Sequence, residues 1–185
     1  MPKNKNIKVL LTQNQIKQKV KLLAKKISRD YKGRELIIIP VLKGSILFFS
    51  DLIRHLDIEC EVDFLSVSSY KGTKSSGSAR LLMDLRQNPA GRHLLLVEDI
   101  VDTGVTLDYL CRNLKSRGPL SVKTCVLLDK PVLRKAHVKI DYKGFTVPDK
   151  FVVGYGLDYE EKYRNLPYIG ILKLKIVSSE ASSER

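Results

Sequence analysis

The sequence has few cysteines and histidines, and it has no long apolar segment. Three cysteines (Cys60, Cys111 and Cys125) are scattered without metal-type spacing, as expected of reduced thiols in a cytosol. The three histidines are isolated, so the sequence predicts neither a zinc site nor a histidine base. No apolar run approaches the length of a membrane span, and the Lys-rich beginning lacks the apolar region of a signal peptide. We therefore expect a cytoplasmic protein with no membrane partner.

Acidic residues are scarce in the first 34 residues, where eleven Lys or Arg stand against one acid, Asp30. This segment carries a net charge of +10, whereas the rest of the chain carries only +3. Nucleic-acid binding is one interpretation. We favour a solvated helix face plus a loose tail, because Tyr31 is the only aromatic residue there and no helix-turn-helix or RNA-binding signature accompanies the charges. A positive field would also attract a polyanionic substrate.

Length and hydrophobic patterning predict one α/β domain over residues 1–185. The chain is 43% hydrophobic, which is enough for a sizeable core. The apolar run at residues 94–97 lacks polar alternation, as in a central parallel strand covered on both faces. Buried strands are also expected at residues 36–40 and 122–128. Helical patterns at 16–27 and 107–115 complete a recurring strand–loop–helix unit. We expect a central, mainly parallel sheet flanked by helices, with its core at about residues 34–135.

The two ends of the chain depart from this rhythm. Residues 1–8 are polar and are expected to be frayed. Residues 136–170 are rich in turn signals, which predicts a small hood, or lid, with the amino-terminal arm as a candidate contributor. Late strands are expected at 168–172 and 174–177, and residues 178–185 form a Ser/Glu tail with no fold signal.

The central apolar run leads directly into two carboxylates, Glu98 and Asp99, and then into a short loop over residues 102–106. Gly104 allows this loop to approach a ligand closely, and the helix that follows points unpaired N–H groups at it. Such a site suits a phosphate. The acids beside it fit sugar hydroxyls, or Mg²⁺ held through water. From the pattern class alone, a strand end with solvated acids and a capped helix is about equally plausible.

Weaker signals lie at neighbouring strand ends. Lys43 and Gly44 form a second glycine loop suited to a diphosphate. Residues 69–78, rich in Ser, Gly, Lys and Thr, are predicted to be a mobile loop that could close as a lid. Composition alone favours a surface role for Lys130. Phe151 is either a core aromatic or a face on which a planar base stacks.

Residues 94–106 closely resemble the phosphoribosyl pyrophosphate (PRPP) motif of the type I phosphoribosyltransferases, within them the hypoxanthine-guanine branch. Four further patches match this family in the expected order. They are residues 42–44, 69–77, 127–130 and 149–164. One variable position differs from some relatives, because Val105 stands where they have a long side chain, which should leave the backbone phosphate cradle intact.

The resemblance implies a type I phosphoribosyltransferase fold with a hood and a flexible catalytic loop. It implies Mg²⁺-dependent transfer of the 5-phosphoribosyl group from PRPP to N9 of hypoxanthine or guanine, giving IMP or GMP and pyrophosphate. A homodimer or homotetramer is usual in the family. Three alternatives remain: a xanthine-preferring enzyme, a nucleic-acid-binding regulator and a non-catalytic ligand-binding domain. The residues that argue against the last two are Lys130, Phe151, Asp158 and Arg164.

The resemblance also assigns roles to residues. It places the 5′-phosphate and ribose on Glu98, Asp99, Asp102, Thr103, Gly104, Val105 and Thr106. It places the pyrophosphate on Lys43, Gly44 and Arg164, with a non-proline cis peptide at the Lys-Gly loop and with Ser69 and Tyr70 closing above. It places the purine on Lys130, Phe151, Val152 and Asp158. Asp102 is the expected base toward purine N7, and the metal falls to Glu98, Asp99 and Asp158.

Overall fold

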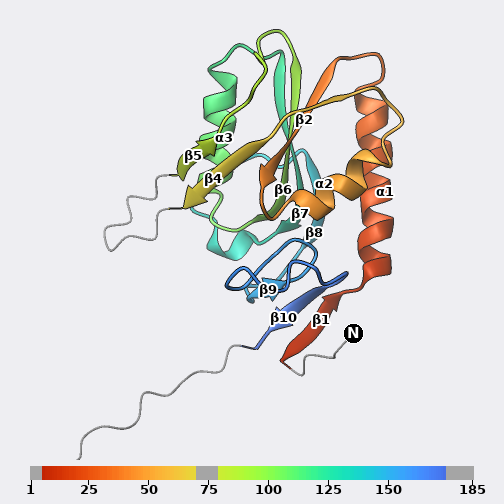
Figure 1. Cartoon of the computed structure of the whole chain (residues 1–185), viewed down its shortest axis with the longest axis vertical. Helices are drawn as coiled ribbons and strands as arrows, with labels where there is room; N and C mark the ends of the chain where they lie inside the picture. The colour runs from red at the N-terminus through yellow and green to blue at the C-terminus, as the bar shows by residue number, and fades with distance from the viewer. Residues whose placement is uncertain (1–5, 70–78, 174–185) are drawn as a thin grey trace, which may run out of the picture.

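The computed structural model describes residues 6–69 and 79–173, whose strands form a main sheet and a small sheet (Figure 1). The main sheet contains β2 (Leu36–Leu42), β3 (Glu61–Val62), β4 (Leu65–Ser69), β5 (Ala79–Met83), β6 (His93–Val101), β7 (Ser121–Asp129) and β8 (Tyr142–Thr146). The small sheet contains β1 (Ile7–Leu11), β9 (Val152–Val153) and β10 (Ile169–Leu172). The main sheet has the order β5-β4-β2-β6-β7-β8, with β3 also paired to β2, and the small sheet has the order β1-β10-β9.

The main sheet is parallel except for β5, which pairs antiparallel with β4. Helices cover both of its faces: α1 (Gln13–Asp30) and α2 (Ile46–Ile53) lie on one face, and α3 (Val105–Lys115) lies on the other. Successive side chains of a strand point to opposite faces. Ile38 accordingly packs with the α1 and α2 side chains, whereas Ile37 and Ile39 pack with those of α3. The predicted α/β fold with a central, mainly parallel sheet is confirmed.

The long helix α1 begins at a capping box. Oγ1 of Thr12 accepts a hydrogen bond from the Gln15 amide at 3.3 Å, and Oε1 of Gln15 accepts one from the Thr12 amide at 2.8 Å, which satisfies two N–H groups at the helix start. The buried face carries Ile16, Val20, Leu23, Ala24 and Ile27. Lysines such as Lys17, Lys21 and Lys25 lie on the exposed face. Within residues 6–69 and 79–173, no helix combines the length and apolarity that crossing a bilayer requires.

The expectation that residues 1–8 are frayed is wrong for Ile7 and Lys8, which begin β1. Ile7 pairs with Leu172 of β10 in an antiparallel register. A Cβ built on Gly170 would lie only 2.3 Å from Cγ2 of Ile7, so the glycine allows β1 to approach closely. Ile7 and Lys8 follow the polar residues 3–6, and the partner of this strand lies near the other end of the sequence, so neither feature marks them as a strand in the sequence. The late strand expected at 168–172 corresponds to β10, and residues 174–177 lie outside the described ranges.

The hood was expected from residue 136, yet β8 belongs to the main sheet, where it pairs with β7. Gly144 makes this pairing possible, because a Cβ at that position would lie 2.3 Å from the Leu127 carbonyl oxygen. The buried Tyr142 donates a hydrogen bond to Asp30 at the end of α1, at 3.0 Å. A Lys-Gly pair reads as a turn in the sequence, whereas here it sits within a covered edge strand.

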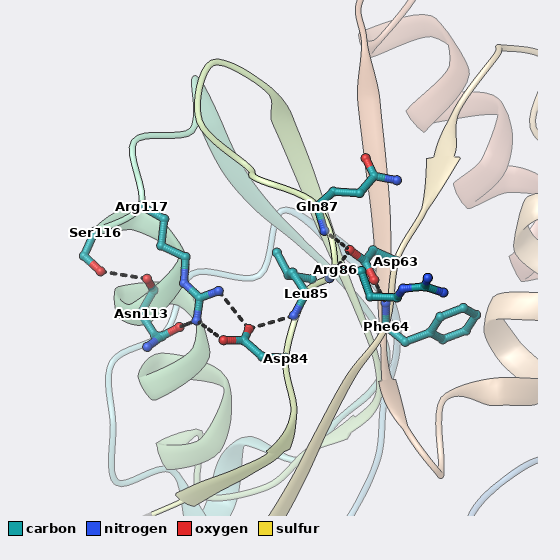
Figure 2. Close-up of polar contacts among 9 residues, drawn as sticks. All are labelled: Asp63, Phe64, Asp84, Leu85, Arg86, Gln87, Asn113, Ser116 and Arg117. Atoms are coloured by element: carbon teal, nitrogen blue, oxygen red, sulfur yellow. Dashed lines mark hydrogen bonds and ion pairs between the residues drawn. The ribbon is translucent and has the colours of Figure 1, made fainter.

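Two aspartates anchor the base of the β4–β5 hairpin (Figure 2). Asp63 is 4% exposed, and its carboxylate accepts hydrogen bonds from the Phe64, Arg86 and Gln87 amides at 2.8, 2.8 and 3.0 Å. Asp84 is half-exposed and accepts two hydrogen bonds from Arg117, at 2.7 and 2.9 Å. The first carboxylate fixes the segment that follows β5, and the second ties that segment to the end of α3.

We expect Asp63→Ala to lower the free energy of unfolding by about 2–4 kcal/mol, because it removes the acceptor of three backbone amides in a buried setting. Asp84→Ala is the matched control, and its exposed ion pair predicts a loss of about 1 kcal/mol or less. Urea unfolding of both variants measures the difference. Equal losses would contradict the assigned role of Asp63.

Candidate active site

The loops after β2, β6 and β7 meet at the carboxyl edge of the main sheet, where open parallel sheets bind their ligands. The Lys130 amide donates to the Val101 carbonyl at 2.9 Å, which joins the ends of β6 and β7. In Figure 1 the small sheet lies beyond this edge. The residues of the predicted site therefore come from both sheets and from the loops between them.

Glu98 and Asp99 are adjacent carboxylates near the end of β6. Glu98 is 7% exposed. Burial, and then the charge of Asp99, raise the pKa of Glu98 well above its usual value, and burial raises the pKa of Asp99 to about 6. Oδ1 of Asp99 also accepts a hydrogen bond from the Ile100 amide at 2.8 Å. Burial thus disfavours the charged form of both acids, and a nearby positive charge such as a bound cation would favour their ionisation.

Gly44 lies between Asp99 and the loop that contains Gly156. A Cβ built on Gly44 would lie 1.8 Å from Oδ2 of Asp99. On its other side, the Gly44 carbonyl oxygen lies 2.0 Å from where a Cβ of Gly156 would be, and Gly156 has a φ of +100°. The Leu42–Lys43 peptide bond just before is cis, as the resemblance implies. No side chain can be accommodated at Gly44 unless its neighbours move.

The loop after β6 has the features of an anion site. Gly104 is the N-cap of α3, with a φ of +81° and no side-chain cap, which leaves the first amides of the helix pointing at the loop. The carbonyl of Thr103 accepts hydrogen bonds from the Lys135 and Ala136 amides at 2.8 and 3.1 Å. A Cβ on Gly104 would lie 2.9 Å from Cδ of Arg134. The segment after β7 thus holds the loop from behind, and the helix dipole favours a phosphate in front of it.

Lys130 is buried rather than a surface lysine, since it is 8% exposed. Its ammonium lies 3.0 Å from Oδ1 of Asp149 and 3.7 Å from Oδ2 of Asp102. The other oxygen of Asp102, Oδ1, is buried and has no hydrogen-bond partner among the described residues. The end of β7 thus brings a cation to the first residue of the phosphate-type loop, beside an acceptor that a ligand could satisfy.

Phe151 is 43% exposed, so it is not a core aromatic. The ring of Tyr159 contacts it edge-on, with ring centroids 5.5 Å apart and an interplanar angle of 87°. The next residue, Val152, is buried in β9 and pairs with Ile171. The small sheet therefore fixes the backbone while the Phe151 ring presents an apolar surface.

Two cationic side chains, Arg164 and Lys43, pair with acids of residues 158–161. Nη1 of Arg164 donates to the Gly156 carbonyl at 2.8 Å, and its Nη2 lies 2.9 Å from Oδ1 of Asp158. Nζ of Lys43 lies 3.1 Å from Oε2 of Glu161. Neither Glu161 nor the pairing of Lys130 with Asp149 was predicted from the sequence. The two acids, Asp149 and Glu161, sit within the patch 149–164, but acids in a polar loop carry no periodic signal that would mark them.

Some predicted residues are not brought together. Within the described ranges, no three His, Cys, Asp or Glu side chains form a cluster able to hold a metal ion. Glu98, Asp99 and Asp158 are thus no preformed cage, which is compatible with Mg²⁺, an ion that keeps waters and ligand phosphates in its shell. Ser69 ends β4, and Tyr70 lies outside the described residues.

A profile of the phosphoribosyl transferase domain matches residues 6–160, and the chain belongs to this family. The hypoxanthine-guanine phosphoribosyltransferase of Lactococcus lactis subsp. lactis (strain IL1403) is 49% identical over 170 residues, which are 91% of this chain and 92% of the relative. The hypoxanthine-guanine-xanthine phosphoribosyltransferase of Tritrichomonas foetus is 46% identical over 167 residues, or 90% and 91% of the two chains.

A crystal structure of a hypoxanthine phosphoribosyltransferase from Staphylococcus aureus matches with a TM-score of 0.89 at 44% identity, covering 94% of this chain and 95% of that one. The resemblance to the hypoxanthine-guanine branch and the type I phosphoribosyltransferase fold are therefore confirmed.

Proposed function

We propose that this chain transfers the 5-phosphoribosyl group from PRPP to N9 of hypoxanthine or guanine, giving IMP or GMP and pyrophosphate. The observation that carries the proposal is the position of Lys130, whose ammonium lies 3.7 Å from Asp102 at the start of the phosphate-type loop. A group able to read a base thus lies at the start of a loop whose amides are able to hold a sugar phosphate. The names of the relatives support the proposed activity.

We assign the 5′-phosphate and the ribose to the end of β6 and the start of α3. The amides of Thr103, Gly104, Val105 and Thr106 would hold the 5′-phosphate, since anions bind at helix N-termini. Glu98 and Asp99 would order the ribose hydroxyls. As pyrophosphate leaves, the anomeric carbon gains positive character, which these carboxylates stabilise.

The purine falls between Lys130 and the Phe151 ring. Lys130 would donate to the 6-oxo group, and because an ammonium donates but cannot accept, it favours hypoxanthine and guanine over adenine. Phe151 would stack on the base, and the Val152 carbonyl and Asp158 would lie along its edge. N9 forms the bond to the ribose, the bond to pyrophosphate breaks, and Asp102 accepts the proton from N7.

The pyrophosphate falls to Lys43, Gly44 and Arg164. Two cations of different shape would face it, and Arg164 offers a fork that suits phosphate oxygens. Ser69 and Tyr70 would close above the reacting groups and exclude water. Assembly as a homodimer or homotetramer in the cytoplasm belongs to the same proposal, and gel filtration tests the assembly.

Phosphoribosyltransferases generally require Mg²⁺, and the donors present here fit it. Glu98, Asp99 and Asp158 supply oxygen ligands, the kind that Mg²⁺ prefers. Burial raises the pKa of the first two, so they gain most from a nearby cation. When bound, the ion would offset charge on the departing pyrophosphate oxygens.

A base panel tests the proposal. The enzyme is incubated with PRPP, Mg²⁺ and, in turn, hypoxanthine, guanine, xanthine or adenine, and ultraviolet absorbance follows nucleotide formation. We expect turnover of hypoxanthine or guanine and none of adenine. Xanthine is included because the Tritrichomonas relative is named for all three 6-oxopurines. Absence of nucleotide with every 6-oxopurine would overturn the proposal.

We expect Lys130→Ala to lower kcat/KM for the 6-oxopurine by roughly 10- to 100-fold, because it removes a charge-assisted hydrogen bond to the base. The KM for PRPP should change little. Lys150→Ala, at an exposed position nearby, is the control and should leave both constants unchanged. A collapse of PRPP binding in Lys130→Ala would mean that Lys130 serves the phosphoribosyl side of the site.

A further inference from the structure

The two cations assigned to pyrophosphate share one internal anion. Oε2 of Glu161 lies 3.1 Å from Nζ of Lys43 and 3.3 Å from Nη2 of Arg164. A single carboxylate oxygen thus stands where an oxygen of a bound phosphate would meet both cations.

The loop that contains Glu161 has an unusual backbone conformation. Glu160, Glu161 and Tyr163 have φ values of +51°, +61° and +75°, a conformation that costs non-glycine residues free energy. The Glu161 amide donates to Oδ2 of Asp158 at 2.9 Å, and the backbones of Tyr159 and Lys162 form an isolated antiparallel β-bridge. Three residues in the left-handed conformation thus fold this loop so that the Glu161 carboxylate lies between Lys43 and Arg164.

We propose that Glu161 is an internal counter-anion, which occupies the pyrophosphate subsite when it is empty and is displaced by the diphosphate of PRPP or by pyrophosphate. The inference deepens the proposed function and rests on its assignment of Lys43 and Arg164 to pyrophosphate. Glu161 competes with the ligand for both cations, and it thereby sets how tightly pyrophosphate is held and how readily it leaves.

The contacts of Glu161 suit an exchangeable anion. The side chains of Lys43 and Glu161 are 70% and 66% exposed, and exposed ion pairs are weak and easily replaced. Arg164 does not depend on Glu161 for its orientation, because Gly156 and Asp158 hold the guanidinium at 2.8 and 2.9 Å. Displacement of Glu161 therefore frees two cations without loosening Arg164.

Binding of inorganic pyrophosphate tests the inference, measured by isothermal titration calorimetry at fixed Mg²⁺. We expect Glu161→Gln to bind pyrophosphate roughly two- to tenfold more tightly than the parent enzyme, with a lower KM for PRPP, because a neutral side chain competes weakly for the cations. The dissociation constant for IMP should not change. The gain should shrink at high ionic strength, where screening weakens the ion pairs of the parent enzyme.

Three variants keep the outcomes separate. Glu160→Gln removes the same charge from the neighbouring position, which is no ion-pair partner of Lys43 or Arg164, and should give a smaller gain. Glu161→Asp keeps the charge but shortens the side chain, and should give an intermediate value. If Glu161→Gln leaves pyrophosphate binding unchanged or weakens it, the inference is overturned. If Lys43→Ala also leaves pyrophosphate binding unchanged, the assignment of Lys43 to pyrophosphate fails instead.

Discussion

Replacing Asp102 by asparagine is expected to lower kcat by roughly 10²- to 10⁴-fold, the range that a positioned general base contributes. The Asp102 side chain is 42% exposed, and its Oδ1 has no hydrogen-bond partner among the described residues, so the carboxylate is able to accept a proton from a bound purine. Asparagine keeps the shape of the side chain but cannot accept that proton as a base. The KM for PRPP should change little, because backbone amides supply the phosphate cradle.

Asp149→Asn is the matched control for Asp102→Asn. Asp149 is the nearer carboxylate partner of Lys130, at 3.0 Å compared with 3.7 Å for Asp102. If both carboxylates act only by holding Lys130, the two variants should lose similar amounts of activity. A much larger loss in Asp102→Asn, in single-turnover rates with saturating PRPP, supports direct proton transfer. Unchanged kcat in Asp102→Asn would remove Asp102 as the base.

The core of the fold could be predicted because its signals are local. The runs at 36–40 and 94–97 are continuous and apolar, and 122–128 is interrupted only by Lys123 and Thr124, since each lies in a strand covered on both faces. The strands β2, β6 and β7 contain them. The glycine of the loop after β6 likewise marks the start of α3 in the sequence. In these places burial alone dictates the residue type, so the sequence is sufficient.

The parts that were missed depend on partners far away in the sequence. β1 is only five residues long and follows the polar start of the sequence, and it becomes a strand because β10 pairs with it. β8 contains Lys143 and Gly144, and it joins the main sheet only because the glycine lets the β7 backbone approach. The contact of Glu161 with Lys43 joins residues 118 positions apart. No periodicity or composition reports such encounters, so only the folded chain reveals them.

Gly44→Ala is expected to lower kcat/KM by roughly 100-fold, because a displacement of about 1 Å in positioning groups has an effect of that size. The new Cβ would lie 1.8 Å from Oδ2 of Asp99, so the carboxylate, the Lys43 turn or both must move. Crowding at a packed site should also cost about 1–3 kcal/mol of unfolding free energy. Gly33→Ala is the control: its φ of +70° adds backbone strain, but nothing lies within 4 Å of its Cβ, so activity should be retained.

A double-mutant cycle identifies the atom responsible. Gly44 is absent from the glycines with positive φ, so left-handed strain cannot explain a loss of stability on adding a Cβ. If the clash with Asp99 is the cause, Gly44→Ala should cost clearly less in an Asp99→Ala background, with a coupling of about 1–2 kcal/mol in urea unfolding. An equal cost in both backgrounds would instead place the conflict elsewhere around residue 44. In that event Asp99 would not need Gly44 as its neighbour, and the reason for a glycine beside Lys43 would have to be sought in the approach of Gly156.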